Sequence, residues 1–211
     1  MTLDDLPDLR PALARVLAAP APPAGLPGLG APAASPLGFA PDRAIRERAV
    51  TAVAGLLGTD NPAGAAALSQ SDVFGALDEA MTAQDLSVND LSDVFGAYLT
   101  HLWELSNGVV RDASPARLGA VARQARAVLL DAVPQNRRSP GDLQVLSDAL
   151  AVQVFVYGVT AFRLTQDWKD RTRAVAENYR DLGRSLLGLN LDLFTLDDNG
   201  LVARSEQGFQ T

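Results

Sequence analysis

The sequence predicts an all-α protein, a bundle of five or six helices, from three observations. Apolar residues recur at spacings of three and four along most of the chain after Pro41, which is the period of an amphipathic helix. Helix-capping residues and glycine or proline stops separate these stretches. The chain has 211 residues, of which 47% are hydrophobic, so it can bury one sizeable core. One helical domain is therefore expected.

Residues 1–41 are predicted to form an arm ahead of a helical domain over residues 42–211. The arm opens with leucines at helical spacing despite two prolines, and these are the candidate interaction residues: Leu3, Leu6, Leu9 and Leu13. Residues 19–41 then hold seven of the 13 prolines, a composition typical of a semi-rigid linker rather than a core. The sequence leaves open whether the arm lies on its own domain or on a neighbouring subunit.

The hexapeptide Ser-Asp-Val-Phe-Gly-Ala occurs twice, at residues 71–76 and 92–97. Two copies without a third favour a local duplication or two similarly built helix starts over a repeat array. The pattern predicts two neighbouring helices that each present a Phe beside a Gly-Ala pair. A glycine at such a position lets another helix approach closely.

The helices are expected in the following order. The first begins near Pro41 and ends at Gly58, and the second follows Ser71 as its N-cap. The third begins at a capping box formed by Ser87 and Asp90 and stops at Asn107-Gly108. Its apolar face is the clearest in the chain: Leu91, Val94, Phe95, Tyr98, Leu102 and Leu105.

Two more helices are expected to open at Ser-Pro pairs, Ser114-Pro115 and Ser139-Pro140. The second contains the longest apolar run, residues 150–162. Because this run continues the helical pattern without a break, it is predicted to be a buried helix rather than a strand. This run falls short of the roughly 20 residues that span a bilayer, so no transmembrane segment is predicted. A last amphipathic helix ends at Gly188, and the turn signal Asp198-Asn199-Gly200 predicts a small C-terminal hairpin.

Composition excludes several classes of function. A net charge of -7 does not favour nucleic-acid binding, and the absence of cysteine excludes disulfides, thiol catalysis and thiolate metal sites. The chain has no common catalytic or nucleotide-binding motif, so no cofactor is expected. The N-terminus lacks the features of a secretory signal. The cytoplasm is the default expectation, and an exported or periplasmic location stays open if a signal peptide has been removed.

Three constellations are weighed as sites. The only histidine, His101, precedes Glu104 by three residues on one helix, which suits an acid-base pair in an interhelical cleft. The helical wheel places His101 at the edge of the apolar face and Glu104 further into the polar face. This arrangement is more typical of a boundary histidine on an ordinary helix than of a catalytic one.

The second constellation nearly fits a calcium loop, with Asp197, Asn199 and Glu206 at the third, fifth and twelfth positions. Thr195 replaces the opening carboxylate, which favours a simple turn over a metal site. The third constellation is a basic stretch that contains Arg111, Arg117, Arg123, Arg126, Arg137 and Arg138. Such arginines are more typical of an ordinary solvated helix face than of a nucleic-acid-binding surface.

Three stretches carry a resemblance to known sequences: residues 72–76, residues 89–93 with Ala97-Tyr98, Trp103 and Asn107-Gly108, and residues 189–202. On these motifs, about residues 42–203 resemble an uncharacterised bacterial family of small helical proteins. This resemblance implies a helical domain in a bacterial protein, and it adds no catalytic residue. The sequence thus predicts a non-catalytic interaction or assembly module, homo-oligomeric or bound to a protein partner through its arm. A hydrolytic enzyme or a ligand-binding bundle near His101 and Glu104 is the alternative.

Overall fold

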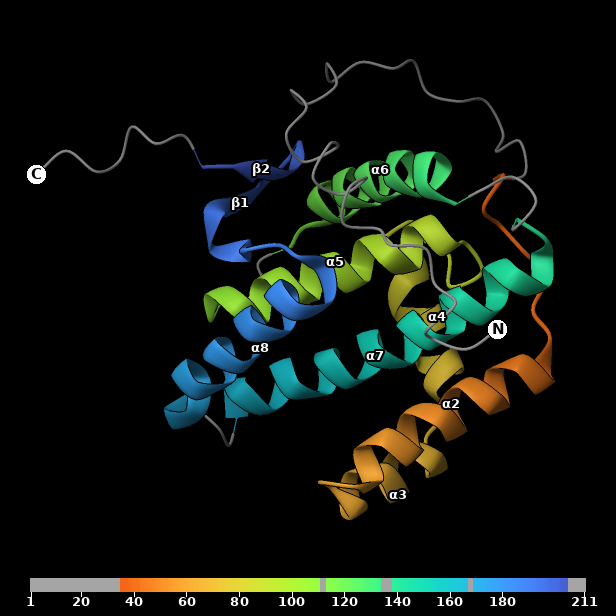
Figure 1. Ribbon diagram of the computed structural model, residues 1–211, viewed down its shortest axis with the longest axis horizontal. Coiled ribbons are helices and arrows are strands. Elements are labelled where there is room, and N and C mark those ends of the chain that lie inside the picture. The colour runs from red at the N-terminus through yellow and green to blue at the C-terminus, as the bar shows by residue number, and fades with distance from the viewer. Residues whose placement is uncertain (1–34, 111–112, 134–137, 167–168, 205–211) are drawn as a thin grey trace, which may run out of the picture.

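The computed structural model describes residues 35–110, 113–133, 138–166 and 169–204, and these residues are mostly helical (Figure 1). Their α-helices are α2 (Arg43–Gly58), α3 (Pro62–Gln70), α4 (Val73–Thr82), α5 (Leu91–Asn107), α6 (Pro115–Ala132), α7 (Pro140–Gln166) and α8 (Thr172–Leu187). The all-α prediction is confirmed, although the described residues form seven helices rather than the expected five or six. The short helix α3 escaped prediction because its Ala- and Gly-rich sequence carries no clear apolar period.

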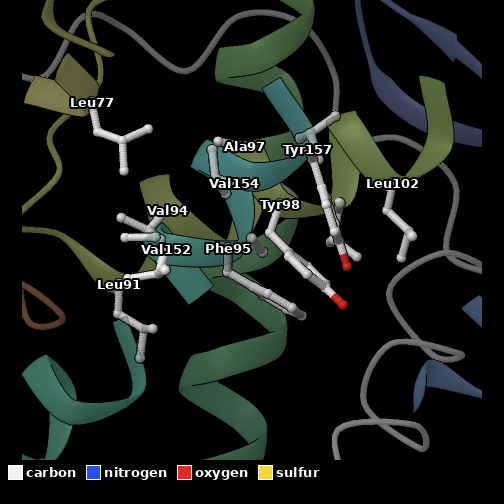
Figure 2. Packing of buried hydrophobic residues seen from close by; sticks show 14 of the residues in the cluster. Leu77, Leu91, Val94, Phe95, Ala97, Tyr98, Leu102, Val152, Val154 and Tyr157 are labelled. Atoms are coloured by element: carbon white, nitrogen blue, oxygen red, sulfur yellow. The ribbon is translucent and has the colours of Figure 1, made fainter. Parts of the chain in front are cut away.

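Helix α5 is the central element of the bundle. It contacts α6, α7 and α8, and it runs between α6 and α7 in Figure 1. The predicted apolar face is buried, but so is most of the opposite side, since 14 of its 17 residues are buried. Figure 2 shows its residues Phe95 and Tyr98 beside Val152 and Tyr157 of α7. An all-round buried helix is typical of the middle of a bundle.

All three tyrosines of the chain form one series of contacting rings, tilted between Tyr98 and Tyr157 and edge-to-face between Tyr157 and Tyr179. The ring centroids of Tyr98 and Tyr157 lie 5.5 Å apart, and those of Tyr157 and Tyr179 lie 5.0 Å apart. Burial raises the pKa of each of these phenols above its usual range, because the low-dielectric interior disfavours a phenolate. The series joins α5, α7 and α8 into one core.

Helix ends follow the predicted signals in most places. Ser114 caps α6 ahead of Pro115, and Gly108 and Gly188 end α5 and α8 in the left-handed conformation, each with a φ of 66°. Two starts were wrong by one to three residues. Asp72 rather than Ser71 caps α4, and Asp90 rather than Ser87 caps α5.

The two hexapeptides lie at different depths in their helices. In the first copy, Asp72 is the N-cap and its carboxylate accepts a hydrogen bond from the Gly75 amide at 3.0 Å. In the second copy, the helix has already begun at Leu91, and Gly96 packs against the α6 backbone. A Cβ at Gly96 would lie 2.6 Å from the Ala122 Cα. Close helix approach is therefore a property of Gly96 alone.

Residues just ahead of position 42 pack against the helical domain. Leu37, inside the predicted linker, is fully buried in the core, and its carbonyl accepts a hydrogen bond from the Leu91 amide at 3.1 Å. The Phe39 amide donates to the Asn89 carbonyl at 3.0 Å. Residues 35–39 thus dock beside the start of α5. The sequence did not predict this contact, because the proline-rich composition indicated a linker and a single buried leucine produces no apolar period.

The predicted C-terminal hairpin is present. Strands β1 (Phe194–Asp197) and β2 (Gly200–Ala203) pair antiparallel, after a 3-10 turn over Leu191–Leu193. The side chain of Gln124 on α6 holds the hairpin, because it accepts from the Leu201 amide at 2.9 Å and donates to the Leu201 carbonyl at 3.0 Å. The hairpin therefore belongs to the domain.

Helix α7 is longer than its apolar run. Its 27 residues make it, among the described residues, the one helix that could cross a membrane by length and composition. Of its most apolar window, 44% is buried inside the fold. Because the core helix of a water-soluble protein has the same features, length and composition alone do not assign α7 to a membrane.

Candidate functional site

His101 and Glu104 meet on α5 as their spacing predicts. The His101 Nδ1 and Glu104 Oε2 atoms lie 2.9 Å apart, and Glu104 Oε1 accepts a hydrogen bond from the Ala113 amide at 3.2 Å. The His101 side chain is 29% exposed. The imidazole is therefore partly open to solvent while it contacts Glu104.

The predicted position of Glu104 on a polar face is wrong. Glu104 is 1% exposed, because α5 is enclosed by its neighbours on nearly every side. A buried carboxylate that receives a backbone amide links the C-terminal half of α5 to the segment leading into α6. This arrangement fits a structural connection as readily as an acid-base pair.

The calcium candidate forms an ordinary turn in its described part. The Asp197 carboxylate accepts a hydrogen bond from the Asn199 amide at 2.7 Å, and Gly200 has a φ of 102°. The third residue, Glu206, lies outside the described residues. Within residues 35–204, apart from the gaps, no group of three or more carboxylate and histidine side chains could hold a metal ion.

The basic stretch contains arginines with structural contacts. Arg117 lies 3.6 Å from the Asp198 carboxylate of the hairpin turn, and Arg138 donates to the carbonyls of Val133 and Leu130 at the end of α6. Arg123 is exposed and Arg126 is partly buried. Arg111 and Arg137 lie outside the described residues, as do the arm leucines, Leu3, Leu6, Leu9 and Leu13.

A buried polar cluster between α2 and α7 was not predicted. The Gln144 side chain accepts a hydrogen bond from the Asp42 amide at 2.9 Å and donates to the Asp42 carbonyl at 2.8 Å. The same amide nitrogen donates to Asp148 at 2.9 Å. Gln144, Ser147 and Asp148 are all buried in the first half of α7. The polar residues Gln144 and Asp148, four positions apart beside Leu143 and Leu146, were the signal in the sequence.

Arg46 lies near this cluster, and its charge favours the ionised form of Asp148. Its guanidinium donates to Asn89 at 2.7 Å and lies 4.5 Å from the Phe74 ring centroid, which is a cation-π contact. Beside it is a surface groove of about 830 Å³ between α2 and α4, which is lined by both cationic and anionic side chains, including Arg43, Glu47, Asp72 and Asp78. The mixed charges select no ligand class, so the cluster is best described as the anchor of α2.

The C-terminal half of α7 exposes an apolar stripe, which we define as Phe155, Val159 and Phe162. Their spacing of four and three places them on one helix face. Phe155 is half-buried, Val159 is 44% exposed and Phe162 is 51% exposed. Exposed apolar side chains that share one face are typical of an interaction surface, whereas single ones are ordinary.

Comparison with known proteins found no matching family model, no similar curated protein and no similar solved structure. The resemblance to an uncharacterised bacterial family stays a prediction.

Proposed function

We propose that the protein is a non-catalytic assembly module that binds a second copy of its own chain. The observation that supports this proposal is the α7 stripe, in which Val159 is 44% exposed and Phe162 is 51% exposed. Covering such side chains contributes roughly 25 cal/mol for each Å² of apolar surface removed from water. A net charge of -7 opposes random self-association, so the contact requires a localised apolar surface.

The division of α7 into two halves favours a protein contact over a membrane contact. Its first half carries the buried Gln144, whose side chain bonds the Asp42 backbone at the start of α2, and the buried Asp148, which accepts a hydrogen bond from Gln144. Polar groups of this kind belong to a helix packed within a protein rather than one surrounded by lipid. The stripe is confined to the second half, where it forms a narrow face rather than a complete apolar surface.

The proposal is tested by the variant Val159→Asp, measured by sedimentation velocity over a range of concentrations. A buried charge in the contact should lower the association constant by at least roughly tenfold, because an unpaired charge is costly to remove from water. Leu56→Asp is the matched control, since Leu56 is 65% exposed on another helix. Equal association of all three proteins, with unchanged circular dichroism, would remove the stripe from the contact.

Hydrolysis or small-ligand binding at His101 and Glu104 is the second candidate, and their 2.9 Å contact favours it. A panel of small ester and amide substrates, compared between the native chain and His101→Gln, tests it. Turnover that the substitution abolishes would support an enzyme. Equal rates of substrate turnover in both proteins would indicate that His101 and Glu104 have only a structural role.

A further inference from the structure

We propose that the α7 stripe binds the Leu-rich N-terminal segment, residues 3–16, of a second copy of the chain. This inference rests on the proposed function and names the part of the second copy that makes the contact. The binding mode is a helix that lays its apolar face on an apolar helix surface of another chain. Three properties of the two partners support it, namely their apolar spacing, their charges and the length of the linker.

The apolar spacings of the two partners agree. The segment presents its leucines at intervals of three and four residues, and the stripe presents Phe155, Val159 and Phe162 at the same intervals. At 1.5 Å per residue, the stripe spans about 10 Å and Leu3 to Leu13 would span about 15 Å as a helix. Two or three leucines can therefore lie along the stripe at once.

The charges of the two partners are complementary. Residues 1–9 contain Asp4, Asp5 and Asp8 and no lysine or arginine. The end of the stripe leads into residues 163–173, where four cationic side chains outnumber two carboxylates in a protein of net charge -7. An acidic segment end beside this basic end would place the segment antiparallel to α7. The charges would then select both the site and the direction of binding.

The linker is long enough to reach a second molecule. Residues 35–39 are held beside the start of α5, so the linker joins the domain there. Residues 17–34 contain five prolines, and at about 3.1 Å per residue such a chain extends to about 55 Å. This exceeds the length of α7, about 40 Å at 1.5 Å per residue. Val159 is 44% exposed in the single chain and so is open to a second copy.

The absence of cysteine allows a direct test by site-specific cross-linking. Two full-length variants are made separately, one with Leu9→Cys and one with Val159→Cys, and they are mixed with a short bis-maleimide. The expected result is a covalent dimer that contains one chain of each variant. Ala52→Cys replaces Val159→Cys as the control, because Ala52 is exposed on α2. The control dimer should form at least roughly tenfold more slowly, because binding raises the local thiol concentration only at the true contact.

Equal cross-linking at positions 52 and 159 would overturn the inference, and so would no cross-linking at either position. A chain with both Leu9→Cys and Val159→Cys that links only within itself would show that the segment binds its own domain. If Val159→Asp abolishes self-association while Leu9→Cys fails to link to position 159, the assembly function stands and this choice of segment fails. If the native chain is a monomer at every concentration, both fail.

Discussion

At the scale of single residues, Asp148 is a carboxylate enclosed in the protein interior. It is fully buried, and one of its oxygens accepts a hydrogen bond from Gln144 while the other has no partner among the described residues. Burial raises the pKa of Asp148 to about 6, although the Gln144 hydrogen bond and the charge of Arg46 favour the ionised form. The cluster that anchors α2 therefore includes a carboxylate that folding makes harder to ionise.

We predict that Asp148→Asn removes part of the pH dependence of stability. The folded pKa of about 6 exceeds the unfolded value of about 3.9, so the folded state keeps a proton that the unfolded state loses. The stability that this proton provides is complete below about pH 4 and is lost as the pH rises through about 6. Urea unfolding should show the variant more stable than the native chain at pH 7, by on the order of 2 kcal/mol.

The difference between the two proteins should vanish near pH 4. The carboxyl of Asp93, whose pKa burial also raises to about 6, contributes equally to both proteins and cancels in the comparison. A difference in the free energy of unfolding that is the same at pH 4 and pH 7 would contradict the assignment to Asp148.

At the scale of elements, the two hexapeptides show that one sequence can occupy two structural positions. Gly75 lies in the first turn of α4, where a Cβ would meet the capping carboxylate of Asp72 at 2.2 Å. Gly96 lies in the middle of the buried α5, where a Cβ would meet the Ala122 backbone. A side chain can move away, but a helix backbone can do so only by shifting α6 against α5.

Gly96→Ala is therefore predicted to destabilise the protein by about 2–3 kcal/mol, as overpacking does in a dense core. Gly75→Ala is the matched control in the same hexapeptide. It should change stability by less than about 1 kcal/mol, because lost capping offsets the better helix propensity of alanine. Thermal unfolding followed by circular dichroism measures both. Equal losses at the two glycines would contradict the different packing of α5.

Helix starts and stops were largely predictable because their signals are local. Ser114, Gly108 and Gly188 act through their own hydrogen bonds or backbone angles, which sequence encodes directly. The burial of Glu104 was not predictable, since it depends on how many helices surround α5. The anchor formed by Gln144 joins residues 102 positions apart, and a single sequence does not indicate such a pairing.

At the scale of the whole molecule, α7 combines two environments in one helix. Its first half packs inside the bundle and its second half keeps an apolar face exposed. Apolar periodicity predicted the helix but could not separate these roles, because both halves are apolar. The arm leucines of the proposed contact stay a prediction, because they lie outside the described residues. The stripe could be found only from the arrangement of helices around α7 (Figure 1).

The most direct test of the assembly function is the solution mass of the native full-length chain, measured by sedimentation equilibrium at several concentrations. We predict a mass that rises with concentration from the 22.2 kDa of one chain toward an integer multiple of that value. A mass that stays at that of one chain at every concentration would contradict self-assembly.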